Sequence, residues 1–299
     1  MTKKLNNSGL VYIDKPAGIT SHDVVAQLRR HFQTRRVGHG GTLDPMATGL
    51  LIVGIESGTK LLQFVTDAPK SYSATVRLGQ NTITDDAEGE VVSTRDPHYL
   101  TDDEVAAAFA SQVGFIDQVP SSVSAIKING ERAYNKVRAG ESVELAARKI
   151  EISQLTIERI SRDKFIDVDI SVNCSKGTYI RAIARDVGEQ LKVGGHLTAL
   201  RRTSIGKVAV TESRTIADAE LVPLHSAVAR FMPVHEISTD DLASVKVGRF
   251  LPWPVGSDTS VPALALVSSE TSDVVAIGKP VDFRGEIMLG YHSVFLVEN

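Results

Sequence analysis

A single carboxylate, Asp44, stands out among the residues of this chain that could do chemistry. It lies in the stretch VGHGGTLDPMATGLL, residues 37–51, where four glycines, two threonines and one histidine surround an Asp-Pro step. Because the residue before a proline is pushed toward an extended conformation, Pro45 would hold Asp44 clear of regular structure. An Asp before Pro is also common at turns. The stretch alone therefore leaves two interpretations open, a capping aspartate or a carboxylate presented to a ligand.

The composition argues against chemistry by a cofactor or a metal. The chain has 299 residues, a net charge of -3 and one cysteine, Cys174, which excludes an internal disulfide and a cysteine-rich zinc site. The eight histidines contain no HExxH pair, and the glycines form neither a dinucleotide fingerprint nor a phosphate-binding loop. We therefore predict no cofactor and no metal. Since no apolar run is long enough to span a membrane, we expect a cytoplasmic protein without a membrane partner.

Hydrophobic periodicity predicts both strands and helices to position Asp44. Alternating or compact apolar runs predict strands over residues 9–16, 50–55, 70–79 and 164–177. Helical spacing predicts helices over residues 20–32, 100–114 and 178–192. Thr20 or Ser21 would cap the first helix, and Thr101 with Glu104 has the spacing of a capping box for the second. This mixture predicts an α+β fold, a mixed sheet with flanking helices.

The stretch around Asp44 resembles the signature of the bacterial tRNA pseudouridine-55 synthase family, or TruB family, which reads G-H-x-G-T-L-D-P-x-A-T-G. Further blocks resemble the family in the family's own order: DKPAGITSHDVV, KSYSATVRLG, TDDAEGEV, CSKGTYIRAIARDVGEQL and HLTALRRTSIG. The resemblance implies a pseudouridine synthase fold, with a largely antiparallel sheet core in a catalytic domain over residues 1–235. It also implies a thumb insertion at about 119–150. After residue 235, short apolar runs between turn residues predict a small β-rich domain over residues 236–299, which we interpret as PUA-like and RNA-binding.

Three catalytic residues follow from the resemblance. Asp44 would be the nucleophile, and Arg181 would pair with it, since a guanidinium close to a buried carboxylate favours the ionised form. The glycine and threonine before Arg181 would start a helix and place Arg181 in its first turn. Tyr72 would stack on the target uracil, because an unperturbed tyrosine titrates too high to be a ready base.

Substrate-binding roles are implied for further residues of the same motifs. His39 would insert into the RNA loop that the target base vacates, and Leu200 would form an apolar wall of the site. Lys15 corresponds to a family position beside the active site. Gly41 and Thr42 would contact the RNA, since glycines permit close backbone approach.

Basic residues fall into three clusters that could follow an RNA backbone. The first is Arg29, Arg30, Arg35 and Arg36, the second Lys127, Arg132, Lys136 and Arg138, and the third Arg201, Arg202 and Lys207. In a chain with a net charge of -3, such clusters favour a one-sided basic surface that contacts phosphates.

The function implied by the resemblance is isomerisation of uridine to pseudouridine at position 55, in the T-loop of tRNA, by a cofactor-free monomer. The target base must leave its stack, so base flipping is part of the prediction. Two alternatives stay open. The same core could act on another RNA with a guide or partner protein, or the chain could be a tRNA folding factor, which needs the RNA surface but not Asp44.

Overall fold

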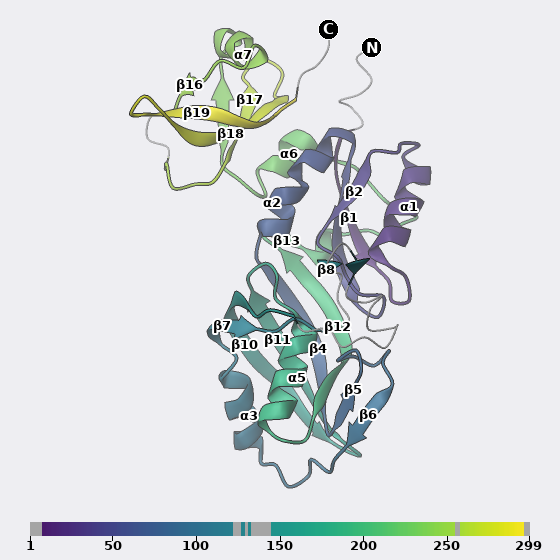
Figure 1. Ribbon diagram of the computed structural model, residues 1–299. Helices are drawn as coiled ribbons and strands as arrows, with labels where there is room; N and C mark the ends of the chain where they lie inside the picture. Colours follow the sequence, from purple (N-terminus) through teal and green to yellow (C-terminus); the bar gives the residue numbers. More distant parts are fainter. Residues whose placement is uncertain (1–7, 122–126, 129–130, 133–144, 255–257, 296–299) are drawn as a thin grey trace.

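The computed structural model describes residues 8–121, 127–128, 131–132, 145–254 and 258–295. Figure 1 shows a large sheet with helices on it and a smaller sheet at one end, near α2 and α6. Among the described helices, none has the length and apolar character needed to cross a bilayer. The α+β class predicted from the periodicity is confirmed.

Ten strands of the described chain form the large sheet, in the order β14-β1-β3-β12-β4-β11-β10-β7, with β13 beside β12 and β2 beside β3. Their bounds are β1 Gly9–Lys15, β2 Val37–Gly40, β3 Thr48–Ile55, β4 Lys70–Leu78, β7 Gly114–Gln118, β10 Arg148–Arg162, β11 Ile166–Cys174, β12 Gly195–Ile205, β13 Val208–Ala209 and β14 Val222–Pro223. Strand β12 joins two halves of this sheet. It is parallel to β3 and antiparallel to β4 and β13.

Two of the helices begin at the caps predicted from the sequence. The main ones are α1 Ser21–His31, α2 Leu62–Asp67, α3 Asp102–Ala110, α5 Ile180–Gln190, α6 Leu224–Val228 and α7 Thr239–Lys246. Thr20 caps α1, and Thr101 with Glu104 forms the capping box of α3, as predicted. Helix α5 buries one face against the inner face of β4, β11 and β12, in a core that also includes α3. Arg181 is the second residue of α5, as predicted.

A second sheet lies after residue 233, with the order β15-β17-β18-β19-β16. Its strands are β15 Val234–Ile237, β16 Leu251–Pro252, β17 Leu264–Ser268, β18 Val274–Phe283 and β19 Glu286–Val294. Ala265 and Ile277 of this sheet share a hydrophobic core with Leu10 and Tyr12 of β1. Because the two sheets share this core, the domain boundary at residues 235/236 stays a prediction.

The glycines before Asp44 do not all lie in a loop. Gly38 and Gly40 lie in β2, paired with β3. A side chain at Gly40 would come within 2.5 Å of Val65, so packing on α2 requires this glycine. The thumb insertion predicted at about 119–150 lies mostly outside the described residues. Its flanking strands pair directly, with Gln118 opposite Arg148.

Candidate active site

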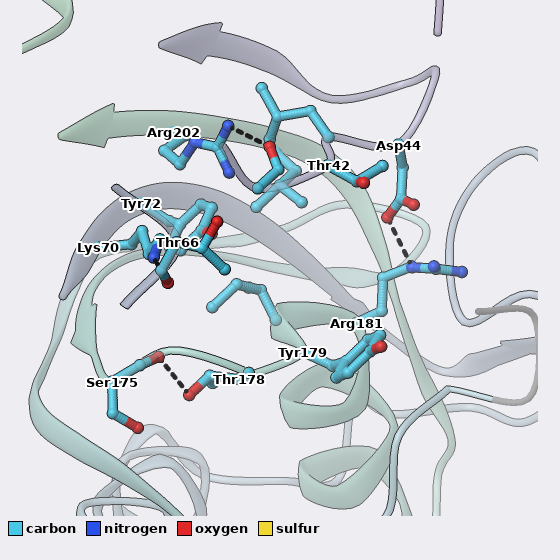
Figure 2. A pocket seen from close by; sticks show the side chains of 15 residues that line it. Thr42, Asp44, Thr66, Lys70, Tyr72, Ser175, Thr178, Tyr179, Arg181 and Arg202 are labelled. Carbon is cyan, nitrogen blue, oxygen red and sulfur yellow. Dashed lines mark hydrogen bonds and ion pairs between the residues drawn. The ribbon is translucent and has the colours of Figure 1, made fainter. Parts of the chain in front are cut away.

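A cavity of about 270 Å³ opens where the two halves of the large sheet meet. Its walls come from the segment between β2 and β3, from β4, from the turn before α5, and from β12 (Figure 2). Asp44, Tyr72, Arg181, Leu200 and Arg202 all line it. Five residues that were chosen from motifs far apart in the sequence therefore share one pocket.

Asp44 presents its carboxylate to this cavity. Its Oδ2 lies 3.0 Å from Nε of Arg181, and its side chain is 35% exposed, whereas that of Arg181 is 5% exposed. The turn at this point is made by the main chain, since the amide of Ala47 donates to the carbonyl of Asp44 at 3.1 Å. Leu43 and Ala47 anchor the segment in the core. The carboxylate is thus paired with Arg181 at the cavity, and the turn is closed by the main chain.

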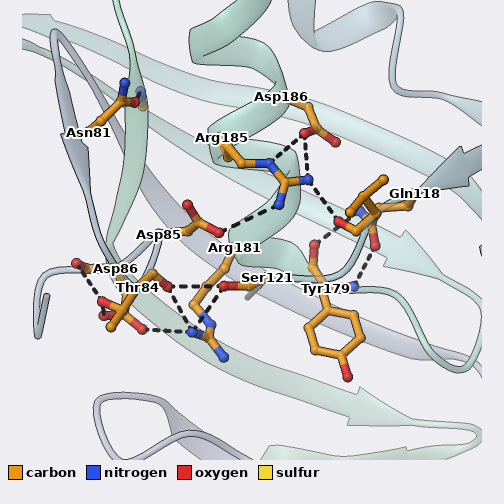
Figure 3. Close-up of polar contacts among 12 residues, drawn as sticks. Asn81, Thr84, Asp85, Asp86, Gln118, Ser121, Tyr179, Arg181, Arg185 and Asp186 are labelled. Carbon is orange, nitrogen blue, oxygen red and sulfur yellow. Dashed lines mark hydrogen bonds and ion pairs between the residues drawn. The ribbon is translucent and has the colours of Figure 1, made fainter. Parts of the chain in front are cut away.

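Arg181 has further partners that were not predicted from the sequence. Its Nη1 donates to the carbonyl of Thr84 at 2.8 Å and lies 3.3 Å from Oδ2 of Asp86 (Figure 3). The Asp86 side chain is 4% exposed and also accepts from the Thr84 hydroxyl and the Glu88 amide. One guanidinium therefore joins two carboxylates. Asp86 lies in the TDDAEGEV block, but its residue type alone did not show that it was buried.

Burial raises the pKa of Asp44 above its ordinary 3.8, and the Arg181 guanidinium opposes this. The nearby carboxylate of Asp86 raises the pKa further, while Lys15 lowers it. Glu88 and Tyr72 also interact electrostatically with Asp44. The site thus keeps a carboxylate that is less readily ionised, and more basic, than one in water.

The backbone on both sides of Asp44 is held by the segment after β1. Lys15 is fully buried, and its ammonium donates to the carbonyls of Pro16, Ile19 and Pro45 at 2.9, 2.8 and 3.2 Å. The hydroxyl of Ser21 both donates to the Leu43 carbonyl and accepts from the Leu43 amide. The three donors of Lys15 are thus used on main-chain carbonyls, and substrate binding by Lys15 stays a prediction. It positions the Asp44–Pro45 step.

Arg202 has a comparable role at the ends of the same segment. It is 1% exposed, and its Nε and Nη2 donate to the carbonyls of Leu50 and Gly41 at 2.7 and 3.0 Å. Its buried guanidinium thus holds main-chain carbonyls, and contact with an RNA phosphate stays a prediction. It still lines the cavity, so contact with a base inserted there stays a prediction.

Tyr72 and Leu200 form the apolar side of the cavity. Tyr72 lies opposite Arg202 across β4 and β12, and Leu200 lies opposite Ala74. Burial raises the pKa of Tyr72, with Arg202 opposing, so the phenol keeps its proton at neutral pH. A protonated half-buried ring suits stacking better than proton abstraction.

Comparison with known proteins agrees with this geometry. Residues 29–180 match the sequence profile of the TruB family pseudouridylate synthase, N-terminal domain. A protein of Paenarthrobacter aurescens named tRNA pseudouridine synthase B is 49% identical over 265 residues, or 86% of this chain and 85% of that protein. One of the same name from Mycobacteroides abscessus is 48% identical over 294 residues, or 93% and 98%. The chain belongs to the TruB family.

A solved structure of an archaeal box H/ACA sRNP Nop10–Cbf5 complex contains a chain with the same fold. The TM-score is 0.70 at 23% identity, over 98% of this chain and 87% of that one. This TruB-family protein is accordingly an enzyme, an isomerase of the pseudouridine synthase class.

The remaining expected contacts of this TruB-family enzyme lie around the cavity. Gly41, with a φ of +85°, and exposed Thr42 line it. His39 is fixed in β2 opposite Val53, with its ring edge-on to that of His22 at 5.4 Å. Burial lowers the pKa of His39 to about 4, so its ring is neutral at pH 7. Insertion of His39 into RNA stays a prediction.

The basic clusters are unevenly placed. Arg29, Arg30, Arg35 and Arg36 are exposed around the end of α1. Arg201 pairs with Asp14 at 2.7 Å. Lys127 and Arg132 pair through their main chains, as β8 Lys127–Ile128 and β9 Glu131–Arg132. Lys136 and Arg138 lie outside the described residues.

We expect the activity of this enzyme to fall on the acid side at a pH above the ordinary range of an aspartate. The resemblance implies that ionised Asp44 is the nucleophile. Because its folded-state pKa is raised, protonation would remove that form earlier as the pH is lowered. Below that pKa, turnover should drop about tenfold for each pH unit. The test is the rate of uridine conversion, measured under single-turnover conditions from about pH 4 to pH 8. A rate that stays constant down to the ordinary aspartate range would contradict it.

Proposed function

We propose that this enzyme converts uridine to pseudouridine at position 55 in the T-loop of tRNA, with Asp44 as the nucleophile. The observation that carries the proposal is the 3.0 Å pair of Asp44 and Arg181 at a cavity walled by Tyr72 and Leu200. Relatives about half identical over most of the chain are named tRNA pseudouridine synthase B, which supports tRNA as the substrate.

The reaction is one that a carboxylate without a cofactor is able to promote. The bond between ribose C1′ and uracil N1 breaks, and a bond between C1′ and C5 forms. C5 loses a proton and N1 gains one, so no electrons enter or leave. An ionised Asp44 supplies the nucleophile, and Arg181 stabilises its charge in the ground state and orients it.

The cavity suits a single base taken out of a stack. Flipping a nucleotide costs a few kcal/mol, which contacts in the pocket must offset. The Tyr72 ring offers a stacking face, and Leu200, which is 8% exposed, offers an apolar wall. Gly41 and Thr42 lie at the same opening, where the flipped nucleotide would enter.

RNA outside the cavity would be bound by exposed basic residues. The arginines around the end of α1, Arg29, Arg30, Arg35 and Arg36, precede β2 and the Asp44 segment. We propose that they follow the backbone of the T-arm, together with Lys127, Arg132 and Lys136. We also propose that the enzyme acts as a monomer and that residues 236–299 form an RNA-binding domain.

The test is to map pseudouridine in an unmodified tRNA transcript treated with the enzyme. We expect one product, at position 55, both in whole tRNA and in an isolated T-arm stem-loop. The matched control is a transcript with cytidine at that position, which should yield no pseudouridine. Modification at another position, or in neither RNA, would overturn the assignment of the T-loop.

A further inference from the structure

Two segments of the chain form the seat of Arg181. One is the turn Thr84–Asp86, which supplies a carbonyl and a carboxylate to Nη1. The other ends at Ser121, whose fully buried hydroxyl lies 3.5 Å from Nη1 and donates to the Thr84 carbonyl at 3.3 Å. The orientation of Arg181 toward Asp44 therefore depends on how firmly these two segments are held.

Arg185 touches both segments from one turn further along α5. Its Nη1 lies 3.7 Å from Oδ2 of Asp85, and its Nη2 donates to the carbonyl of Val119 at 2.7 Å (Figure 3). Nε and Nη2 also donate to Asp186, which fixes the guanidinium. Because residues four apart lie on one helix face, Arg181 and Arg185 reach toward the same two segments.

Asp85 makes the turn that brings the partners of Arg181 together. Its φ is +59°, a left-handed conformation that side chains other than glycine adopt at a cost. Its carbonyl accepts from the Leu197 amide at 3.0 Å. The residues on either side, Thr84 and Asp86, both face Arg181, whereas the Asp85 carboxylate turns to Arg185.

We propose that Asp85 and Arg185 are positioning residues for catalysis, which hold the seat of Arg181 and through it the orientation and charge of Asp44. This inference rests on the proposed catalytic role of the Asp44–Arg181 pair. Neither Asp85 nor Arg185 lines the described cavity, so their effect passes through Arg181.

The electrostatics of the pair explain why both members are needed. The side chains of Asp85 and Arg185 are 13% and 18% exposed. Burial raises the pKa of Asp85, whereas Ser121, Arg185 and Arg181 oppose the rise. Without Arg185, the buried carboxylate would turn toward Arg181 or take up a proton, and a strained turn would lose its anchor. In either case Nη1 of Arg181 would be less firmly held, and Asp44 would be less well ionised.

The experiment compares Arg185→Gln, Asp85→Asn and the double variant. For each full-length enzyme, kcat and KM are measured for pseudouridine formation in tRNA. Asparagine tolerates the left-handed turn, so Asp85→Asn removes the charge without adding strain. We expect kcat to fall about tenfold in each single variant and by no more in the double variant, with KM for tRNA unchanged. The acid limb of the kcat profile should also move to higher pH, since Arg181 would stabilise the Asp44 carboxylate less.

Arg162→Gln is the matched control. It removes an arginine that is paired to Asp102 at 2.6 Å, at the end of β10 far along the sheet from Tyr72. A variant with lower kcat but an unmoved acid limb would show a merely structural role and overturn the proposal, as would unchanged kcat. Asp44→Asn, measured in parallel, separates failure of the proposed function from failure of this inference. If it remains active, the proposed function fails. If it is inactive while Arg185→Gln is as fast as Arg162→Gln, the inference alone fails.

Discussion

Asp44→Asn is expected to lower the rate of pseudouridine formation by about 10⁴-fold or more. The amide has the size of the carboxylate but cannot act as a nucleophile, and it can still face Nε of Arg181. The measurement is single-turnover conversion of uridine in a T-arm transcript, with tRNA affinity measured alongside. Affinity should stay near that of the wild type, because exposed arginines rather than Asp44 would bind the RNA backbone.

The same variant should fold at least as well as the wild type at neutral pH. The folded-state pKa of Asp44 is raised, so the fold favours the uncharged form. The stabilisation from proton binding is present below the unfolded-state pKa and is lost as the pH rises through the folded one. Asparagine is uncharged at every pH, so the melting temperature of the Asp44→Asn variant should not fall below that of the wild type. Normal conversion by a folded Asp44→Asn enzyme would refute the nucleophile assignment, and tRNA folding by the inactive variant would reveal a separate chaperone role.

Arg181→Lys should lower turnover by about 10²–10³-fold with little change in tRNA affinity. Lysine keeps the positive charge, but its donors all lie on one atom, whereas Arg181 meets Asp44 with Nε and the Thr84 carbonyl and Asp86 with Nη1. The matched control is Arg77→Lys, which breaks a two-point contact with Asp167 at 2.8 and 2.7 Å. Arg77 points away from the Tyr72 face of β4, so this control should retain activity.

Arg181→Ala is expected to cost stability as well as activity. It leaves Asp86 buried and without its guanidinium, a loss of about 3–5 kcal/mol for such pairs. Adding Asp86→Asn should restore the melting temperature but not the turnover. If the double variant regained turnover, Arg181 would serve the fold alone. The catalytic assignment would also be contradicted if Arg181→Lys bound tRNA much more weakly but kept its turnover.

Much of the fold was predictable because local chemistry agrees with the tertiary structure. Thr20 and Thr101 cap helices as their spacing predicts, and the alternation in residues 164–177 marks β11. Strand β2 was missed because its glycines resemble those of a loop, whereas Gly38 packs against Leu62 and Gly40 against Val65. Strand β10 and helix α7 were also not predicted, since neither has a strong periodic pattern.

The candidate site was predicted in its reactive members and not in its supporting ones. Asp44, Tyr72, Arg181 and Leu200 meet at one cavity, although their roles stay predictions. Lys15 was placed at the substrate by the resemblance and Arg202 by its basic cluster, and neither argument showed that both are buried on main-chain carbonyls. The buried Asp86 was missed because aspartates are usually exposed. Burial of a charge depends on distant segments that no local pattern records.

The position of β12 constrains when this enzyme becomes active during its own synthesis. Asp44 lies just before β3 and Tyr72 lies in β4, and in the described sheet β12 stands between these two strands and pairs with both. In a nascent chain that has not yet released residues 195–205 from the ribosome, we expect β3 and β4 to lack the strand that joins them. Joining them closes long loops late in folding, which is slow in proteins with many distant contacts. Assembly of the catalytic centre thus waits for a strand that contributes little chemistry of its own.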